Sequence, residues 1–286
     1  MKIVFCLTVF FFCFGASAQN EKGKFLRFYS THAMFPDTFR NNHPRVYDGK
    51  MYATAEHYAD SSTYVFVPDY FNKAKPYVLV LYFHGWNNNI DTALLQYQLQ
   101  QQFYDAHQNA IFIFPESAKN APDSYGGKWE QPGEFNWYMQ ELNLFLKEKG
   151  LITGQFTKPS LILAGHSGAY RVMSYILLYT HHTCKGTILF DALYGQTEKF
   201  SMYLKMHPSS RLINIYTDNG GTLQNSKDLE ACFKGWHWPF LSIEEASFHI
   251  SDIRNNRIIF LHSLQTHNEV VSANGNFTRF LQLINL

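Results

Sequence analysis

The chain has 286 residues, of which 46% are hydrophobic and 17% aromatic, and its formal net charge is +1 with histidine counted as neutral. This length and apolar content suit one large domain with a sizeable core. A charge so close to zero, without a block of basic residues, lacks the electrostatic footprint of a nucleic-acid-binding protein. Nucleic acid is therefore excluded as an expected partner.

The start of the chain has the pattern of a cleavable export signal. Residues 3–14 form an apolar run, and Ala16-Ser17-Ala18 supplies a small-x-small cleavage site. A membrane-spanning helix needs about 20 apolar residues, so this run is too short to be an anchor. We expect residues 1–18 to be a signal peptide and Gln19 to begin the mature chain. Residues 19–286 should then form one exported domain, periplasmic or extracellular, without stable membrane insertion.

Short apolar runs alternate with helical stretches, which is the pattern of a mostly parallel sheet flanked by crossover helices. In chain order, the predicted strands cover residues 64–68, 77–83, 110–114, 161–164, 187–190, 212–216 and 258–261. Continuous apolar runs of this kind are typical of strands that are buried on both faces. The sequence therefore predicts an α/β fold in a single domain.

Apart from a helix that begins at Tyr170, three helices are predicted, two between these strands and one after the last strand. The first covers residues 91–107, with Asp91 as its N-cap and with Leu95, Leu99 and Phe103 on one apolar face. The other two cover residues 135–146, with Gly150 as the C-cap, and residues 276–284. Two segments show no clear period, residues 19–62 and residues 219–257. The second of these contains Trp236-His237-Trp238-Pro239 and is a candidate cap for the site.

Two cysteines, Cys184 and Cys232, follow the predicted signal peptide. Export permits a disulfide between them, and two buried free thiols are the alternative, which the sequence leaves open. Neither cysteine lies at the end of a predicted strand, so neither is expected to be a nucleophile.

The stretch Gly165-His166-Ser167-Gly168-Ala169 follows the apolar run 161–164 and leads into a predicted helix. A serine on a strand–turn–helix bend, with small residues two positions before and after it, is the nucleophile elbow of an α/β-hydrolase fold. Such a bend lifts the Ser167 hydroxyl out at the carboxyl edge of the sheet. The motif alone is weak evidence, and the flanking strand and helix strengthen it.

A serine hydroxyl needs a base to take its proton, and the base needs an orienting acid. In this fold the chain order is serine, acid, histidine. His267 fits the base, because it lies in a loop a few residues after the strand 258–261 and near the end of the chain. His262 is the competitor, but it closes the strand itself, so we expect its side chain to be held at the sheet edge.

Two aspartates are candidates for the acid. Asp191 ends the strand 187–190, and Asp218 follows the next strand, 212–216. Most α/β-hydrolases take the acid from the later strand, and pancreatic-type lipases take it from the earlier one. Asp218 belongs to an Asp-Asn-Gly turn, and local hydrogen bonding in such a turn is reason enough for an aspartate at this position. Asp191 ends a buried strand, where a carboxylate needs a partner such as an imidazole N–H. We therefore prefer Asp191 and keep Asp218 as the alternative acid.

Acyl transfer also needs donors for a developing oxyanion. One expected donor is the backbone N–H of Gly168, directly after the nucleophile. The other is the backbone N–H of Trp86, in the loop after the strand 77–83, where Gly85 lets the backbone turn.

The loop after the strand 110–114 contains Asp123 and Lys128. They are candidate substrate contacts, since ligands bind at the carboxyl edge of such sheets. A turn that merely folds the loop is the simpler alternative. No set of residues has metal-ligand spacing, and no glycine-rich phosphate or dinucleotide loop occurs, so neither metal nor cofactor is expected.

These motifs resemble a group of exported bacterial α/β-hydrolases. The shared motifs are a His-Gly-Trp-x-Asn-Asn loop, a Gly-His-Ser-Gly-x-Tyr-Arg elbow and a Phe-Asp-x-Leu-Tyr-Gly acid segment, here residues 84–89, 165–171 and 190–195, with 121–128 as a further similar stretch. The resemblance implies Asp191 as the acid and His267 as the base, and it implies no substrate. Residues 64–86 are also similar, more loosely, to secreted esterases of the feruloyl and polyhydroxyalkanoate type.

The sequence thus predicts an exported serine hydrolase that forms an acyl-enzyme on Ser167. Ester cleavage is the first choice, because it is the commonest chemistry on this elbow, and the substrate would be a small-molecule or polymer-borne ester. An amidase or peptidase would use the same triad. A non-catalytic binding domain on the same fold is the alternative from a different class.

Overall fold

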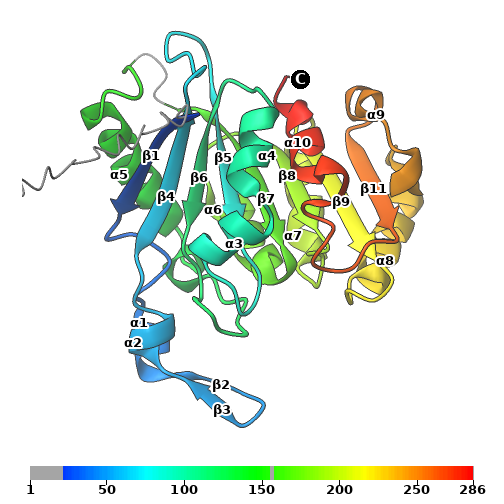
Figure 1. Ribbon diagram of the computed structural model, residues 1–286. Helices are drawn as coiled ribbons and strands as arrows, with labels where there is room; N and C mark the ends of the chain where they lie inside the picture. The colour runs from blue at the N-terminus through cyan, green and yellow to red at the C-terminus, as the bar shows by residue number, and fades with distance from the viewer. Residues whose placement is uncertain (1–21, 155–157, 286) are drawn as a thin grey trace, which may run out of the picture.

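The computed structural model describes residues 22–154 and 158–285, which build a nine-stranded sheet with helices on both faces (Figure 1). The predicted signal peptide, residues 1–18, and the cleavage before Gln19 lie outside the described residues. The strands of this sheet are β1 (Gly23–Tyr29), β4 (Ser62–Pro68), β5 (Val78–Phe83), β6 (Ala110–Pro115), β7 (Ser160–His166), β8 (Cys184–Phe190), β9 (Arg211–Thr217), β10 (Leu241–Glu244) and β11 (Ile258–Ser263).

The sheet is mostly parallel, as predicted. Its strand order is β1-β4-β6-β5-β7-β8-β9-β11-β10. Strand β4 runs antiparallel to both of its neighbours, β1 and β6, and the other pairs are parallel. Each strand predicted from the sequence is present, because a strand buried on both faces carries a continuous apolar run. The loops after the parallel strands therefore meet at one edge of the sheet.

Helices cover the two faces of the sheet. Their bounds are α1 (Thr38–Asn42), α2 (Thr54–His57), α3 (Ile90–Gln96), α4 (Leu99–Asp105), α5 (Glu134–Glu148), α6 (Tyr170–Tyr179), α7 (Thr197–Met206), α8 (Leu223–Gly235), α9 (Ile250–Asn255) and α10 (Asn276–Phe280). Successive side chains of β5 enter opposite layers: Leu81 joins the core beneath α5 to α8, and Val80 joins the core beneath α3, α4, α9 and α10.

The predicted helix 91–107 is two helices. Asn89, not Asp91, is the N-cap of α3, and its side chain accepts a hydrogen bond from the Thr92 N–H. The chain then breaks at Gln98, which has a φ of 50°, before α4 begins. The break leaves Leu95 82% exposed, contrary to the predicted apolar face.

The other two predicted helices are present with adjusted ends. Helix α5 extends over Glu134–Glu148, and Gly150 follows it with the left-handed φ of 65° that favours glycine. The closing helix is α10, which continues as a 3-10 helix over Leu281–Asn285.

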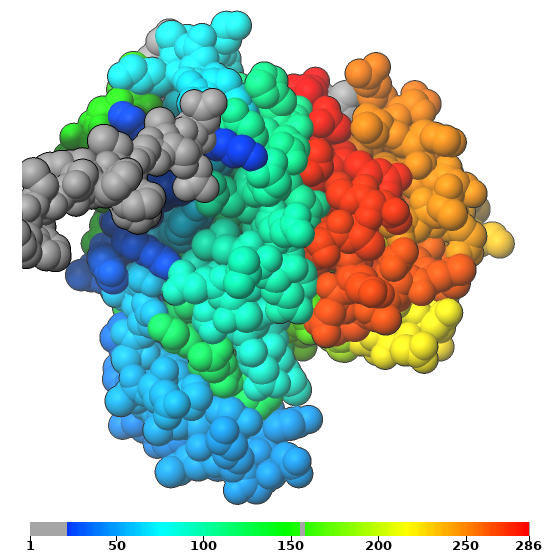
Figure 2. All heavy atoms as spheres, in the orientation of Figure 1, coloured from blue at the N-terminus to red at the C-terminus, as the bar shows by residue number. Residues whose placement is uncertain are grey.

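The segment 19–62, which has no clear hydrophobic period, contains an edge strand and a group of short elements outside the sheet. Strand β1 pairs with β4, and the chain then forms α1, a hairpin of β2 (Arg45–Tyr47) and β3 (Lys50–Tyr52), and α2. This hairpin projects beyond the edge toward which β9 and β11 point (Figures 1 and 2). Most of its side chains face solvent, which explains why the sequence shows no apolar period there.

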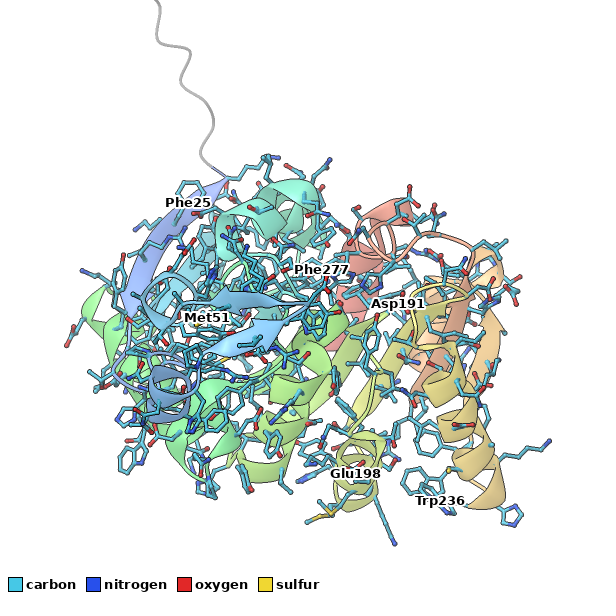
Figure 3. All side chains as sticks on the ribbon, turned by 90° about the horizontal axis from the view of Figure 1, so that it is seen from below. Phe25, Met51, Asp191, Glu198, Trp236 and Phe277 are labelled. Atoms are coloured by element: carbon cyan, nitrogen blue, oxygen red, sulfur yellow. The ribbon has the colours of Figure 1, made fainter. Side chains whose placement is uncertain are left out.

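The segment 219–257 forms α8, β10 and α9 and does not cap the site, because none of its residues lines the cavity described below. Trp236 lies with Glu198 beside a separate groove, away from Asp191 (Figure 3).

The disulfide alternative is excluded, because both cysteines are free thiols, Cys184 buried and Cys232 exposed. Across the described ranges, no helix combines the length and the apolar character needed to cross a membrane.

Candidate active site

Ser167 lies on a sharp bend between strand and helix. Strand β7 ends at His166, Ser167 has a φ of 56°, and a 3-10 turn over Ser167–Ala169 leads into α6. A positive φ at a non-glycine residue is strained and is held only by the surrounding packing. One such close contact is with Gly85, where an added Cβ would lie 2.5 Å from the Ser167 Cβ. The bend thus has the local geometry predicted for a nucleophile elbow.

The structure brings Asp191 and His267 together. Asp191 follows β8, is fully buried, and has its Oδ2 atom 2.7 Å from Nδ1 of His267. The Thr217 N–H and hydroxyl donate to the same carboxylate at 3.2 and 2.7 Å, and the Thr222 hydroxyl donates to it as well. Burial alone would raise the pKa of Asp191, but the hydrogen bonds from His267, Thr222 and Thr217 outweigh it and lower the pKa. The carboxylate is therefore held in its charged form beside the imidazole.

The alternative acid and the alternative base form a separate pair. Nε2 of His262 lies 2.8 Å from Oδ1 of Asp218, and Nδ1 of the same ring lies 2.9 Å from Oε2 of Glu244. Burial alone would lower the pKa of His262, but these two carboxylates raise it. His262 is thus engaged at the sheet edge, and Asp218 is directed to His262 instead of His267.

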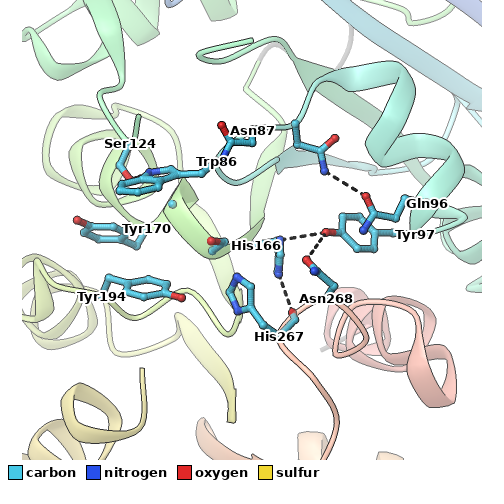
Figure 4. A pocket seen from close by; sticks show the side chains of 13 residues that line it. Trp86, Asn87, Gln96, Tyr97, Ser124, His166, Tyr170, Tyr194, His267 and Asn268 are labelled. Atoms are coloured by element: carbon cyan, nitrogen blue, oxygen red, sulfur yellow. Dashed lines mark hydrogen bonds between the residues drawn. The ribbon is translucent and has the colours of Figure 1, made fainter. Parts of the chain in front are cut away.

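A cavity of about 570 Å³ contains Ser167 and His267 (Figure 4). Its walls consist of aromatic rings and of amide or hydroxyl side chains, and none of its lining residues is Asp, Glu, Lys or Arg. The lining residues are Trp86, Asn87, Asn88, Gln96, Tyr97, Ser124, His166, Ser167, Gly168, Tyr170, Tyr194, His267 and Asn268. An uncharged wall of this kind suits a neutral organic group better than an ion.

Ser167 and His267 face the same cavity without bonding directly. Nδ1 of His267 is taken by Asp191, so Nε2 is the ring nitrogen left for a partner. Within the described residues, no hydrogen bond joins Ser167 to His267, and the Ser167 side chain instead contacts the phenol of Tyr194. Burial raises the pKa of Tyr194 to about 12, and the contact with Ser167 opposes this rise. Serine–histidine hydrogen bonds are often loose before substrate binds and tighten in the complex.

His166 fastens the loop that carries His267. Its Nε2 lies 2.8 Å from the His267 carbonyl oxygen, which only accepts, so Nε2 carries the proton. Its Nδ1 lies 3.3 Å from the Tyr97 hydroxyl, which also reaches the Asn268 side chain at 3.3 Å (Figure 4). Burial, reinforced by the neighbouring His267, lowers the pKa of His166 to about 3. This histidine is therefore neutral at ordinary pH.

The two predicted oxyanion residues, Trp86 and Gly168, both line the cavity next to Ser167. The Trp86 indole is held from two sides: its Nε1 donates to Ser124 Oγ at 2.7 Å, and its ring packs edge-on against Tyr47 of the β2–β3 hairpin, with centroids 5.4 Å apart. The hairpin thus contacts a residue of the cavity wall without lining the cavity itself.

The candidate substrate contacts Asp123 and Lys128 lie elsewhere. Neither lines the cavity. Asp123 is paired with Arg40 at 2.7 Å and accepts from the Tyr58 hydroxyl at 3.0 Å, while Lys128 donates to the Thr31 carbonyl at 2.6 Å. Both residues anchor the loop to the N-terminal segment, which favours the loop-folding interpretation.

Sequence reasoning assigned no role to several residues of the site, although three of them lie inside the motifs 121–128, 165–171 and 190–195. Tyr97, Ser124, Tyr170, Tyr194 and Asn268 line the cavity from five separate places along the chain. No spacing links them, because only the folded sheet brings the loops after its strands together.

Comparisons with known proteins show the fold. No family model and no curated protein matches the chain. Among solved structures, it is similar to a substrate-bound fluorophosphonate-binding serine hydrolase of Staphylococcus aureus, with 10% identity, a TM-score of 0.54, and coverage of 91% of this chain and 98% of that one. It is also similar to a ferulic acid esterase, with 13% identity, a TM-score of 0.56, and coverage of 78% and 92%.

A third similar structure is the S-formylglutathione hydrolase of Staphylococcus aureus without ligand. It is 11% identical, with a TM-score of 0.51 and coverage of 78% of this chain and 90% of that one. Together with the strand order, these matches define the class: the protein has an α/β-hydrolase fold. At such low identity the resemblance concerns the fold alone, and the activity must be argued from the site.

Proposed function

We propose that this protein is an exported serine hydrolase that cleaves esters through Ser167, His267 and Asp191. The observation that carries the proposal is the 2.7 Å contact between the buried Asp191 and His267, because His267 lines the same cavity as Ser167 on its strained bend. Structural similarity to a ferulic acid esterase and to serine hydrolases supports this choice of chemistry.

The proposed reaction has two halves. In the first, Ser167 Oγ attacks the ester carbonyl carbon while its proton passes to Nε2 of His267. The carbon–oxygen bond to the alcohol then breaks, and His267 gives its proton to the departing alkoxide, which leaves an acyl-enzyme. In the second half, water attacks the acyl carbon while one of its protons passes to Nε2 of His267. The bond between the acyl carbon and Ser167 Oγ then breaks, and His267 returns the proton to Ser167 Oγ, which frees the acid and restores the serine. The charged Asp191 stabilises the imidazolium in both halves.

The oxyanion formed in each half needs donors. The backbone N–H groups of Trp86 and Gly168 are proposed for this role, since both residues lie in the cavity beside Ser167. The neutral, aromatic walls favour an uncharged ester, carried by a small molecule or by a polymer.

Covalent labelling tests the nucleophile. A fluorophosphonate probe should add to the wild-type protein at Ser167, and the Ser167→Ala variant should take up none. A folded wild-type protein that forms no adduct, by mass spectrometry, would instead support a binding domain without catalysis.

The acid is tested by two matched substitutions. Asp191→Asn should lower turnover of an activated ester by about ten-thousandfold, because an amide cannot hold the imidazole in its working tautomer or stabilise its charge. Asp218→Asn should cost far less, since Asp218 contacts His262 and lies outside the cavity. The reverse result would move the acid to the later strand.

A matched pair of substrates tests the reaction class. An aryl ester and the amide of the same acid should be compared at equal concentration, and the ester should be cleaved faster relative to its uncatalysed rate. Preferential cleavage of the amide would make the protein an amidase or peptidase with the same three residues.

A further inference from the structure

Ser124 stands beside the expected oxyanion donors. It lies in the loop after β6, lines the cavity, and accepts the Trp86 indole N–H at 2.7 Å. A Cβ added to Gly168 would lie 2.7 Å from Ser124 Oγ and 2.6 Å from Cδ1 of Trp86. Three parts of the chain therefore meet at one point: the elbow, the loop after β5 and the loop after β6.

The hydroxyl of Ser124 is still available as a hydrogen-bond donor. A serine hydroxyl has one donor proton and two acceptor lone pairs, and the Trp86 indole uses one lone pair. Among the described residues, no acceptor takes the Ser124 proton. Because Ser124 lines the cavity, this proton is available to an acceptor that binds there.

The loop that carries Ser124 is tied by hydrogen bonds and an ion pair to the helix that follows the elbow. The Asp123 side chain accepts from the Tyr125 N–H at 3.0 Å, and the Gly126 N–H donates to Glu130 at 2.8 Å. Glu130 in turn pairs with Arg171 at 2.6 Å, on the helix that follows Ser167. Apart from Ser124, the polar side chains of the stretch 121–130 do not line the cavity. Their contacts instead hold the loop that carries Ser124 in place. A donor held in place before reaction costs no reorganisation when charge develops.

We propose that the Ser124 hydroxyl is a third oxyanion donor, a side-chain donor that acts beside the backbone N–H groups of Trp86 and Gly168. The indole of Trp86 orients this hydroxyl by occupying one of its lone pairs. This inference rests on the proposed serine hydrolase function and adds to it a catalytic residue.

The first test is Ser124→Ala. Turnover of an aryl ester should fall about 10- to 100-fold, the range of one lost hydrogen bond to a charged oxygen, with KM changed less than about twofold. Affinity for a trifluoromethyl ketone, which adds to Ser167 and carries the same oxyanion, should fall by a similar factor. Ser124→Thr keeps a hydroxyl and should recover most of the loss.

Two further variants separate the orientation of the Ser124 hydroxyl by Trp86 from a general effect of removing a hydroxyl. Trp86→Phe removes the indole N–H and should give a smaller loss of turnover than Ser124→Ala. Ser201→Ala, on α7 outside the cavity, removes a hydroxyl whose one hydrogen bond within the described ranges goes to the Thr197 carbonyl, and it should leave turnover unchanged. Circular dichroism confirms that each variant is folded.

The outcomes are distinct. Unchanged turnover and unchanged ketone affinity in folded Ser124→Ala would overturn the third donor while leaving the serine hydrolase intact. A higher KM with the same turnover would overturn it as well, because Ser124 would then bind the ground state only. A wild-type protein that cleaves no ester and takes up no fluorophosphonate would overturn both proposals.

Discussion

Acid should destabilise this protein through His166. The side chain is buried, and burial together with the adjacent His267 lowers its pKa from 6.5 to about 3. The groups whose charge acts on it are His267, Asp191 and His84. In the unfolded chain the same imidazole takes up a proton near pH 6.5. Between these two pH values only the unfolded state is protonated, so stability falls as pH falls.

The size of the effect follows from the two pKa values. Each pH unit in this window costs about 1.36 kcal/mol of unfolding free energy. Across the whole window, from pH 6.5 to about 3, the loss due to His166 approaches 5 kcal/mol on this scale. Down to pH 5, where most carboxylates of the unfolded chain are still charged, it is about 2 kcal/mol.

The assay is urea unfolding of wild type and His166→Gln at pH 7.5 and pH 5. Glutamine does not titrate and can still donate an amide N–H toward the His267 carbonyl. Because His182 and His262 titrate in both proteins, the difference between the two pH-dependent losses isolates His166. Wild type should lose about 2 kcal/mol more than the variant.

Equal losses in the two proteins would refute the reasoning. They would mean that His166 accepts a proton in the folded state, through water or through movement of the loop that carries His267.

Three other results are expected. Native alkylation should label the exposed Cys232 and spare Cys184, since burial raises the pKa of that thiol to about 12; mass spectrometry of peptides distinguishes them, and equal labelling would contradict the burial. Thr222→Val should lower the free energy of unfolding by about 1–3 kcal/mol, because Asp191 loses a buried hydrogen bond, and an unchanged urea midpoint would contradict this. Gly85→Ala should slow fluorophosphonate labelling, because its Cβ would lie 2.5 Å from the Ser167 Cβ, and an unchanged rate would mean that the loop yields easily.

The predicted cleavage of the signal peptide can be tested by mass spectrometry. The mature chain should start at Gln19, as read by intact mass of protein from the exporting host. An intact Met1 on exported material would exclude cleavage of the predicted signal.

The sequence by itself determined the elements whose cause is local. The strands that became β4 to β9 and β11 carry the short apolar runs that are typical of strands buried on both faces. Helix α5 has a regular apolar face and a glycine directly after it, so its type and its end were both predictable. The bend at Ser167 was predictable for the same reason, since small residues, a strand and a helix are contiguous there.

Tertiary structure alone decided which side chains meet. Asp191 and His267 are 76 residues apart. The sequence kept Asp218 as the alternative acid, and only the fold shows that Asp218 is directed to His262. Ser124 reaches Trp86 across 38 residues for the same reason. Local patterns decide where a strand ends, but the order of strands in the sheet decides which loop ends become neighbours. That order depends on packing between distant segments, and no short stretch of sequence contains it.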